Sequence, residues 1–476
     1  MIDYYIDNEN LHNEKKAKTV IAILLFGSIL GNFFTFISLK IAFFSIDIQR
    51  ITLCIAVIIV AVEVIKSKNF KVNYIMKSNF PYMLLITFWT LIILFSCFNL
   101  LISSYKIEIA KEIFQLLIVA SLIFLLLFNI YNEKLLFFAL RMTKYFISPL
   151  IIFSYAEMII GIRLDGADYK SPSLNNFDTT LQIPKAYFEN PNDFASVLIL
   201  LYIILIFELS YAKNKKSIIL NMIYMILSII PAIMIDSSIW RITIYVIILI
   251  YIVTLIVGTK NYRAVKMTLI PSIISVLMLT ICKPFIRKFI LYLNIEMMPI
   301  FYKTNGPIKG IISDNLIAGD SLMDQLQETG MGTFNVRKNL FLNGLELSKD
   351  HPFIGAGPGG FEREISANMD KLLPTDNIVN PHNLISELMV EYGYIVLLIF
   401  IILMLFTFFS LLKNAVKSDS KISQIGVLLI GGFIMSTVMP SSFMTAYNYW
   451  ISLIFGLVCY RFVKRKGTFN ESLSRG

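Results

Sequence analysis

The 476-residue chain has few charged residues and few cysteines. Charged residues make up 16% of it, against about 25% in soluble domains, which excludes an ordinary globular protein. The four cysteines, Cys54, Cys97, Cys282 and Cys459, lie in or beside apolar runs without CxxC spacing, so we predict neither a disulfide nor a zinc site. The apolar runs also lack the polar alternation that is typical of membrane β-strands.

Apolar residues are abundant instead. Hydrophobic residues make up 57% of the chain, and the mean hydropathy is +0.71. They form repeated runs of about 20 residues, the length at which a helix crosses a ~30 Å hydrocarbon layer. We therefore predict an all-α polytopic membrane protein with about twelve transmembrane helices. The runs are 19–39, 46–65, 81–103, 110–131, 145–162, 191–212, 218–236, 239–258, 266–286, 384–412, 422–439 and 446–462.

The net charge of +10 is spread over short turns between these runs. Lys and Arg gather after every second run, at 66–77, 134–144, 213–216, 260–266 and 413–421, and in the tail from 461 onward. This pattern predicts that both termini are cytoplasmic. It also explains the basic charge without nucleic acid. Lys106 and Lys111 lie on the other side, so they are secondary site candidates, with solvated turn lysines as the alternative.

Two predicted external segments are long, 163–190 and 287–383. A loop as long as the second is expected to have helices of its own, and apolar spacing predicts one near residues 335–350. The chain then divides into an N-terminal membrane bundle (1–286), a partly helical external loop between the ninth and tenth spans (287–383), and a C-terminal bundle with a short tail (384–476).

His382 follows Asn380 and Pro381 at the start of the tenth run. Because proline favours the first helical position, we expect His382 in the first helical turn, where the helix dipole favours a neutral imidazole that could act as a base. A histidine that anchors the span at the interface is the alternative.

Two arginines are predicted on the same membrane face. Arg241 is placed at the outer mouth of the eighth run, where it either binds an anion or extends to water beside Trp240. Arg337 lies in the external loop and by itself could be solvated. Together with His382, they suggest an anionic ligand such as a diphosphate, which suits the planar guanidinium group.

The segment HPFIGAGPGGF (351–361) is rich in glycine. No strand precedes it and Pro358 interrupts it, so we interpret it as a tight turn rather than a nucleotide loop. His351 is a secondary candidate for which we favour a structural role. Asn190 and Pro191 are expected to cap the sixth run, while Asn192 remains a secondary candidate for contact with a polar ligand.

Two of these segments carry a family resemblance. His382 and Asn383 followed after nine residues by Gly393, and Arg337 followed by HPFIGAGPGGF, resemble motifs of the O-antigen ligase and polysaccharide polymerase superfamily of bacterial envelope proteins. Asn190-Pro-Asn192 and the Ser238 to Arg241 region resemble looser features of that superfamily. The predicted topology also fits.

The resemblance implies an inverting glycosyltransferase of the GT-C kind, without metal or cofactor, on the outer face of the cytoplasmic membrane. Its partners would be a glycan on undecaprenyl diphosphate, an acceptor glycan or glycolipid, the bilayer and a chain-length regulator. Arg241 and Arg337 would hold the diphosphate, and His382 would deprotonate or orient the acceptor hydroxyl.

Three functions are weighed. We favour a polymerase of O-antigen or capsule repeat units, because no external segment is specialised for a lipid A core. An O-antigen ligase with the same donor is the alternative. A flippase for lipid-linked oligosaccharides would show repeat symmetry and ionisable residues in several spans, whereas this chain gathers its polar content in one outer loop.

Overall fold

The computed structural model describes residues 2–31, 39–41, 44–46, 48–67, 79–160, 183–188, 190–258, 262–302, 333–417, 420–438, 442–444 and 446–474. In chain order the elements are α1 (Ile2–Leu30), β1 (Leu39–Ile41), β2 (Phe44–Ile46), α2 (Ile48–Ser67), α4 (Phe80–Ile102), α5 (Lys106–Asn129), α6 (Glu133–Ile160), α7 (Pro191–Tyr211), α8 (Lys215–Ile235), α9 (Ser238–Gly258), α10 (Tyr262–Thr280), α11 (Lys283–Tyr302), α14 (Thr333–Leu347), α15 (Gly360–Ala367), α16 (Leu384–Lys417), α17 (Lys421–Ser436) and α18 (Tyr447–Ser474).

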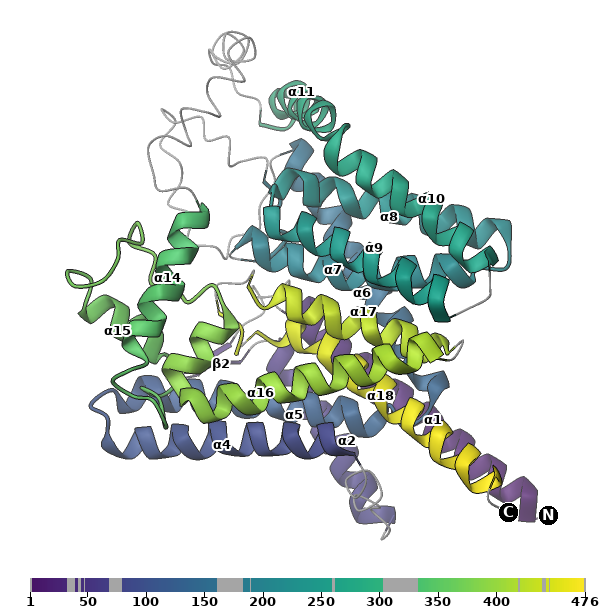
Figure 1. Cartoon of the computed structure of the whole chain (residues 1–476), viewed down its shortest axis with the longest axis horizontal. Helices are drawn as coiled ribbons and strands as arrows, with labels where there is room; N and C mark the ends of the chain where they lie inside the picture. The colour runs from purple at the N-terminus through teal and green to yellow at the C-terminus, as the bar shows by residue number, and fades with distance from the viewer. Residues whose placement is uncertain are drawn as a thin grey trace.

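The described part is a helical bundle (Figure 1). The strands β1 and β2 form a short antiparallel pair that the sequence did not predict, with Lys40 opposite Ser45. Seven of the described helices are long and apolar enough to cross a membrane, namely α4, α5, α6, α7, α8, α9 and α16. The bent pair Leu269–Thr280 and Lys283–Leu293, which meet at 67°, would be an eighth if it is one span.

The expectation of a multi-pass helical membrane protein is therefore confirmed. Each of the twelve apolar runs overlaps a helix, but a count of twelve spans stays a prediction. Most of the expected external loop 163–190 lies outside the described residues.

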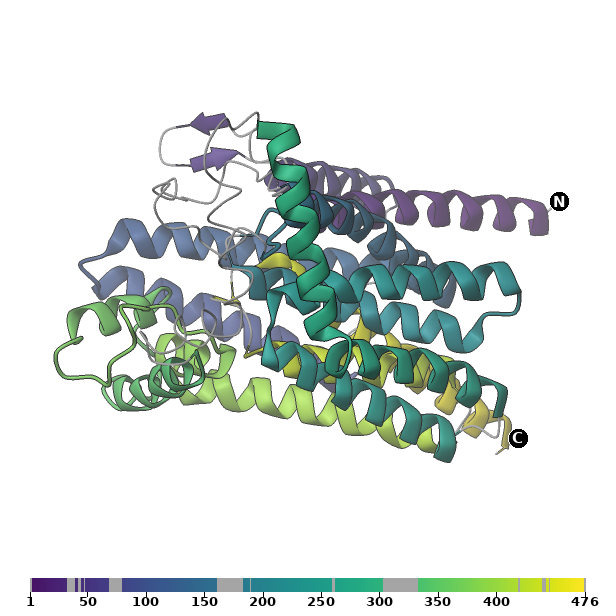
Figure 2. The same ribbon diagram turned by 90° about the horizontal axis from the view of Figure 1, so that it is seen from above.

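The two ends of the bundle differ. Both chain termini lie at one end, and α14 and α15 lie at the opposite end (Figures 1 and 2). The helix expected near residues 335–350 is α14, which buries Val336 and Leu340. These side chains join Phe361 and Ile365 of α15 and Val390 of α16 in a small apolar core. The segment before α16 is thus packed onto the beginning of that helix.

Helix α16 is broken at Gly393, whose φ of 79° and ψ of 174° are not helical. The glycine-rich loop fills the break. The carbonyl groups of Val390 and Glu391 accept hydrogen bonds from the backbone N–H groups of Ala356 (2.8 Å) and Gly357 (3.0 Å). On the far side of the break, the N–H of Tyr394 donates to the carbonyl of Pro352 (2.8 Å). The loop therefore replaces hydrogen bonds that the helix loses.

The glycine-rich loop and the break in α16 lie too close together for a side chain at two positions. A Cβ atom added to Gly393 would lie 2.5 Å from the carbonyl carbon of Phe353, and one added to Gly355 would lie 2.2 Å from that of Glu391. The Glu391 carboxylate accepts a further hydrogen bond from the Phe361 N–H at the start of α15 (3.4 Å). The interpretation of the glycine-rich segment as a structural turn is confirmed.

We predict that Gly393→Ala destabilises the protein by at least about 2 kcal/mol, because a strain of ~1–3 kcal/mol in this backbone conformation, which is essentially restricted to glycine, adds to the clash with Phe353. The measurement is thermal unfolding of the purified protein in detergent. Gly431→Ala is the matched control, since its added Cβ would meet its nearest neighbour, a ring carbon of Phe408, at an ordinary 3.4 Å. Equal melting temperatures for the two variants would contradict the prediction.

Candidate active site

The chain enters α16 through a capped turn. The side-chain oxygen of Asn383 accepts the N–H of Ile385 (2.9 Å), and its carbonyl accepts the N–H of Glu387 (3.0 Å). Asn383 is thus the cap, and His382 precedes it with a left-handed φ of 47°. The prediction that His382 lies in the first helical turn is wrong. The asparagine side chain is the better cap, so the helix begins at Leu384, three residues later than Pro381 suggested.

The segment that follows α17 bonds to Arg337 and to the chain directly after His382. The carbonyl of Thr437 accepts the N–H of Leu384, two residues after His382, at 2.8 Å. The next carbonyl, that of Val438, accepts a hydrogen bond from the Arg337 guanidinium at 2.6 Å. The Arg337 guanidinium and the N–H of Leu384, two residues after His382, therefore bond to adjacent carbonyls of one two-residue segment, although 45 positions separate Arg337 from His382 in the sequence.

A buried carboxylate fixes the next segment of chain. Glu387, only 3% exposed, accepts hydrogen bonds from the hydroxyl of Ser442 (2.7 Å) and from the N–H groups of Phe443 (2.8 Å) and Met444 (3.2 Å). These bonds hold residues 442–444 against the first turn of α16. Sequence reasoning missed Glu387, although a charged residue inside an apolar run is itself a signal of an internal partner.

The start of α7 contributes a negative charge beside Arg337. Burial lowers the pKa of Arg337 from its ordinary value, and the nearby Asp193 carboxylate opposes that shift. Because the ordinary value lies far above neutral pH, the guanidinium stays cationic. The hydroxyl of Tyr449 in α18 is also hydrogen-bonded to Asp193. Four helices, α7, α14, α16 and α18, thus meet around the Arg337 and His382 segment.

Asn190 caps α7, as predicted. Its side-chain oxygen accepts the N–H of Asn192 (2.9 Å) and also the side-chain amide of Asn192 (3.1 Å). Pro191 occupies the first helical position. The amide of Asn192 therefore belongs to the cap.

Arg241 belongs to a second charged group, which we call the Asp236 group. It consists of Asp236, Arg241, Lys283 and Arg287. Arg241 lies 3.7 Å from one carboxylate oxygen of Asp236, Lys283 pairs with that same oxygen, and Arg287 lies 3.0 Å from the other. One carboxylate thus faces three cations. Ser238 also accepts a hydrogen bond from Arg241 (3.1 Å).

The Asp236 group is at the same end of the bundle as Asp193. Helix α8 runs back along α7, so that α9 begins where α7 begins. Within the described residues, Arg241 contacts Asp236 and Ser238, whereas Arg337 bonds to the carbonyl of Val438 and lies near Asp193. The structure therefore places the two arginines in separate groups at one end.

Among the described residues, the remaining candidates share no hydrogen bond or ion pair with either group. Lys106 and Lys111 occupy the first two turns of α5 and have exposed side chains. His351 is exposed as well, and its carbonyl accepts the N–H of Gly355 (3.1 Å), which is a role of the backbone in the turn.

Residues 194–401 match the model of a protein family described as O-antigen ligase. The matched region begins in the first turn of α7 and ends within α16, so it contains Arg241, Arg337 and His382. The match confirms the resemblance found in the sequence motifs. No curated protein matches the chain.

Replacing Glu387 by alanine is predicted to destabilise the protein by about 2–4 kcal/mol, because two buried N–H groups would lose their acceptor. Thermal unfolding and limited proteolysis at residues 442–444 measure the effect. The control is Glu346→Ala, since that side chain is 64% exposed and pairs only with the nearby Lys349. The hydrogen-bonding role is refuted if Glu387→Ala unfolds and is cleaved like the control.

Proposed function

Since residues 194–401 carry the O-antigen ligase family domain, we propose that this membrane protein is a glycosyltransferase that takes a glycan from undecaprenyl diphosphate. We assign the reaction to the outer face of the bacterial cytoplasmic membrane, with both termini cytoplasmic. The acceptor is a sugar hydroxyl on a second glycan or glycolipid. The observation that carries the proposal is that Arg337 and the chain directly after His382, at the Leu384 N–H, bond to the adjacent carbonyls of residues 437–438.

The local charges suit a diphosphate. The side chain of Arg337 is partly buried, which strengthens its attraction for an anion because water screens it less. Asp193 balances this charge when no donor is bound. A diphosphate that approaches Arg337 gains charge-assisted hydrogen bonds, which are stronger than those between neutral groups.

The reaction that we propose is a single displacement. The acceptor hydroxyl oxygen attacks the anomeric carbon of the donor glycan, and the bond between that carbon and the diphosphate oxygen breaks. The bonding electrons leave with undecaprenyl diphosphate, while the hydroxyl proton passes to the imidazole of His382. The configuration at the anomeric carbon is inverted. Arginine side chains stabilise the leaving group, and we therefore propose no role for a metal ion.

We assign Arg241 to the same leaving group. The Asp236 group has three cations and one carboxylate, so it keeps a positive excess that attracts an anion. Its place at the end of the bundle that carries Arg337 supports a shared donor, with the polyprenyl chain entering between helices from the bilayer.

Polymerase is our first choice of reaction and ligase the second. Both reactions use the same donor and differ in the acceptor. The ligase is kept as the alternative because the matched family is described as O-antigen ligase. As a polymerase, the protein builds O-antigen or capsule chains from repeat units. A chain-length regulator is then an expected partner.

We predict that His382→Ala lowers transfer by about 10²–10⁴-fold, the usual contribution of a general base. The assay uses purified protein with undecaprenyl-diphosphate-linked glycan. In cells that lack the native copy, the variant is expected to leave single repeats on the lipid carrier. His351→Ala is the matched control and is expected to retain activity, because the ring of His351 is exposed and its role in the turn is that of its backbone carbonyl.

The same cells separate the alternatives. Long chains that stay unattached to a final acceptor would indicate a ligase, and accumulation on the inner face would indicate a flippase. Normal long polysaccharide with His382→Ala at normal expression would remove His382 from the mechanism.

Arg337→Gln is predicted to lower kcat by about 10²–10³-fold, since one donor to the developing diphosphate charge is lost. Lys338→Gln is the control, because Lys338 is the neighbouring exposed cation on the same helix. Equal losses in both variants would show that general surface charge, rather than the position of Arg337, governs the rate.

A further inference from the structure

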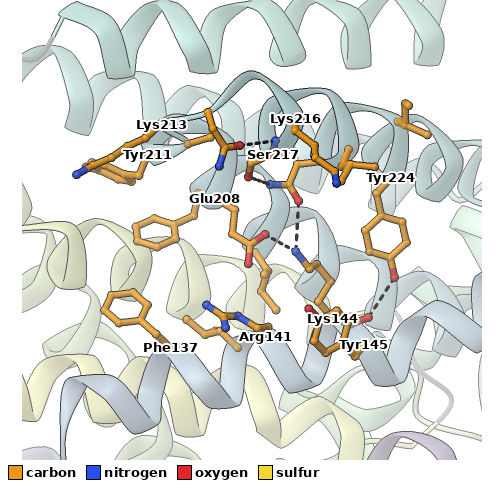
Figure 3. A pocket seen from close by; sticks show the side chains of 18 of the residues that line it. Phe137, Arg141, Lys144, Tyr145, Glu208, Tyr211, Lys213, Lys216, Ser217 and Tyr224 are labelled. Carbon is orange, nitrogen blue, oxygen red and sulfur yellow. Dashed lines mark hydrogen bonds and ion pairs between the residues drawn. The ribbon is translucent and has the colours of Figure 1, made fainter.

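A cavity of about 1000 Å³ lies between α6, α7, α8 and the start of α17 (Figure 3). The last turn of α7, the first turn of α8 and Lys421 at the beginning of α17 all contribute to it. It is therefore near the end of the bundle that carries the chain termini, away from α14 and α15 (Figure 1). The proposed glycosyl transfer does not use it.

The lining is strongly cationic. It contains five basic side chains, Arg141, Lys144, Lys213, Lys216 and Lys421, and one acidic side chain, Glu208. Glu208 pairs with Lys144, whose ammonium group also donates to the Asn221 side-chain oxygen (3.2 Å). The single carboxylate of the lining is thus already engaged. The other basic side chains give the cavity a positive excess that favours an anion.

The polar floor of the cavity is built by several helices. Figure 3 shows Lys144 reaching from α6 toward Glu208 of α7, with Tyr224 of α8 beside it. The Tyr224 hydroxyl donates to the carbonyl of Lys144 (3.1 Å) and lies 2.5 Å from the hydroxyl of Ser148. At the mouth, the ammonium group of Lys421 lies 4.2 Å from the centre of the Tyr211 ring. The basic groups are therefore arranged around an ordered floor.

One wall of the cavity is apolar and faces outward. Leu220, Ile223 and Leu227 line it, yet they are 55%, 49% and 40% exposed. Their spacing puts them on one face of α8, which runs into the membrane from Lys215. A surface of this kind is suited to an acyl chain, whereas a soluble anion would gain nothing from it.

We propose that this cavity binds the phosphate headgroup of an anionic phospholipid, with an acyl chain along Leu220, Ile223 and Leu227. The headgroup lies among Arg141, Lys216 and Lys421. Basic pockets between membrane helices recognise phosphate headgroups in this way. The apolar wall distinguishes a lipid from free phosphate, which shares the same anionic chemistry.

The test uses the full chain, purified in a neutral detergent. Phosphatidylglycerol is titrated with thermal unfolding and native mass spectrometry as readouts, and phosphatidylcholine, glycerol phosphate and inorganic phosphate are compared with it. We expect phosphatidylglycerol to bind at least tenfold more tightly than phosphatidylcholine. The two chain-free phosphates are expected not to compete at the same concentration.

Charge variants locate the site. Arg141→Gln with Lys216→Gln is expected to weaken phosphatidylglycerol binding about 25-fold, because each basic residue near a lipid phosphate contributes about fivefold. Both side chains are exposed, so the melting temperature without lipid should not change. Lys215→Gln is the matched control, since Lys215 is the neighbouring exposed residue on α8 and does not line the cavity.

Three results would overturn the proposal. If Lys215→Gln weakened phosphatidylglycerol binding as much, the binding would depend on general surface charge rather than on the cavity. Equal binding of phosphatidylcholine would remove the anionic selectivity. Full competition by glycerol phosphate or inorganic phosphate would identify a site for a soluble anion. None of these results depends on glycosyl transfer.

Discussion

The backbone contact between the glycine-rich loop and the break in α16 holds the rest of the candidate site in place. A helix that is broken in or near a membrane exposes backbone groups that lipid cannot satisfy. Here the loop at 352–357 supplies partners on both sides of Gly393. Because the loop follows α14 directly and α15 packs beside it, this contact also fixes α14 relative to the start of α16. For that reason Arg337 and the backbone of Leu384, two residues after His382, both bond to residues 437–438.

Two buried carboxylates, Glu387 and Glu391, have structural roles in the packing around α16. Glu387 holds residues 442–444, and Glu391 accepts from the start of α15. Both carboxylates accept hydrogen bonds from backbone N–H groups, which need a partner wherever water is excluded. Among the described residues, Asp193 lies near Arg337, and Asp236 pairs with Arg241, Lys283 and Arg287. The proposed function assigns the positive excess of the Asp236 group to the diphosphate of the donor.

Local patterns predicted much of this structure. Long apolar runs gave helices in every expected place, and the spacing near residues 335–350 predicted α14. The glycines were correctly interpreted as a turn. Contacts between distant segments were not predictable in this way. Glu387 meets residues 55 to 57 positions away, and Asp236 pairs with cations 47 and 51 positions away. The spacing of apolar residues predicts which face of a helix is buried, but it does not identify the element that packs against that face.

The prediction for His382 was wrong for a local reason. Pro381 and Asn383 give competing signals for the start of the helix, and the asparagine cap prevails. The cavity at the other end is a different case. The sequence showed its basic residues only as an indication of the cytoplasmic side. That they gather beside an apolar wall follows from the packing of α6, α7 and α8, which the sequence did not predict.

Helix α7 joins the two ends. It carries Asp193 in its first turn and Glu208 near its last, and it is buried along most of its length. Fifteen residues of helix separate these carboxylates by about 22 Å. Two unit charges at that distance interact by less than about 1 kcal/mol at an effective dielectric constant of about 20, so the lipid headgroup proposed beside Glu208 would have a small direct electrostatic effect on Arg337. Any coupling between the cavity and the candidate active site has to be mechanical, through movement of α7 as a rigid, close-packed body against its neighbours.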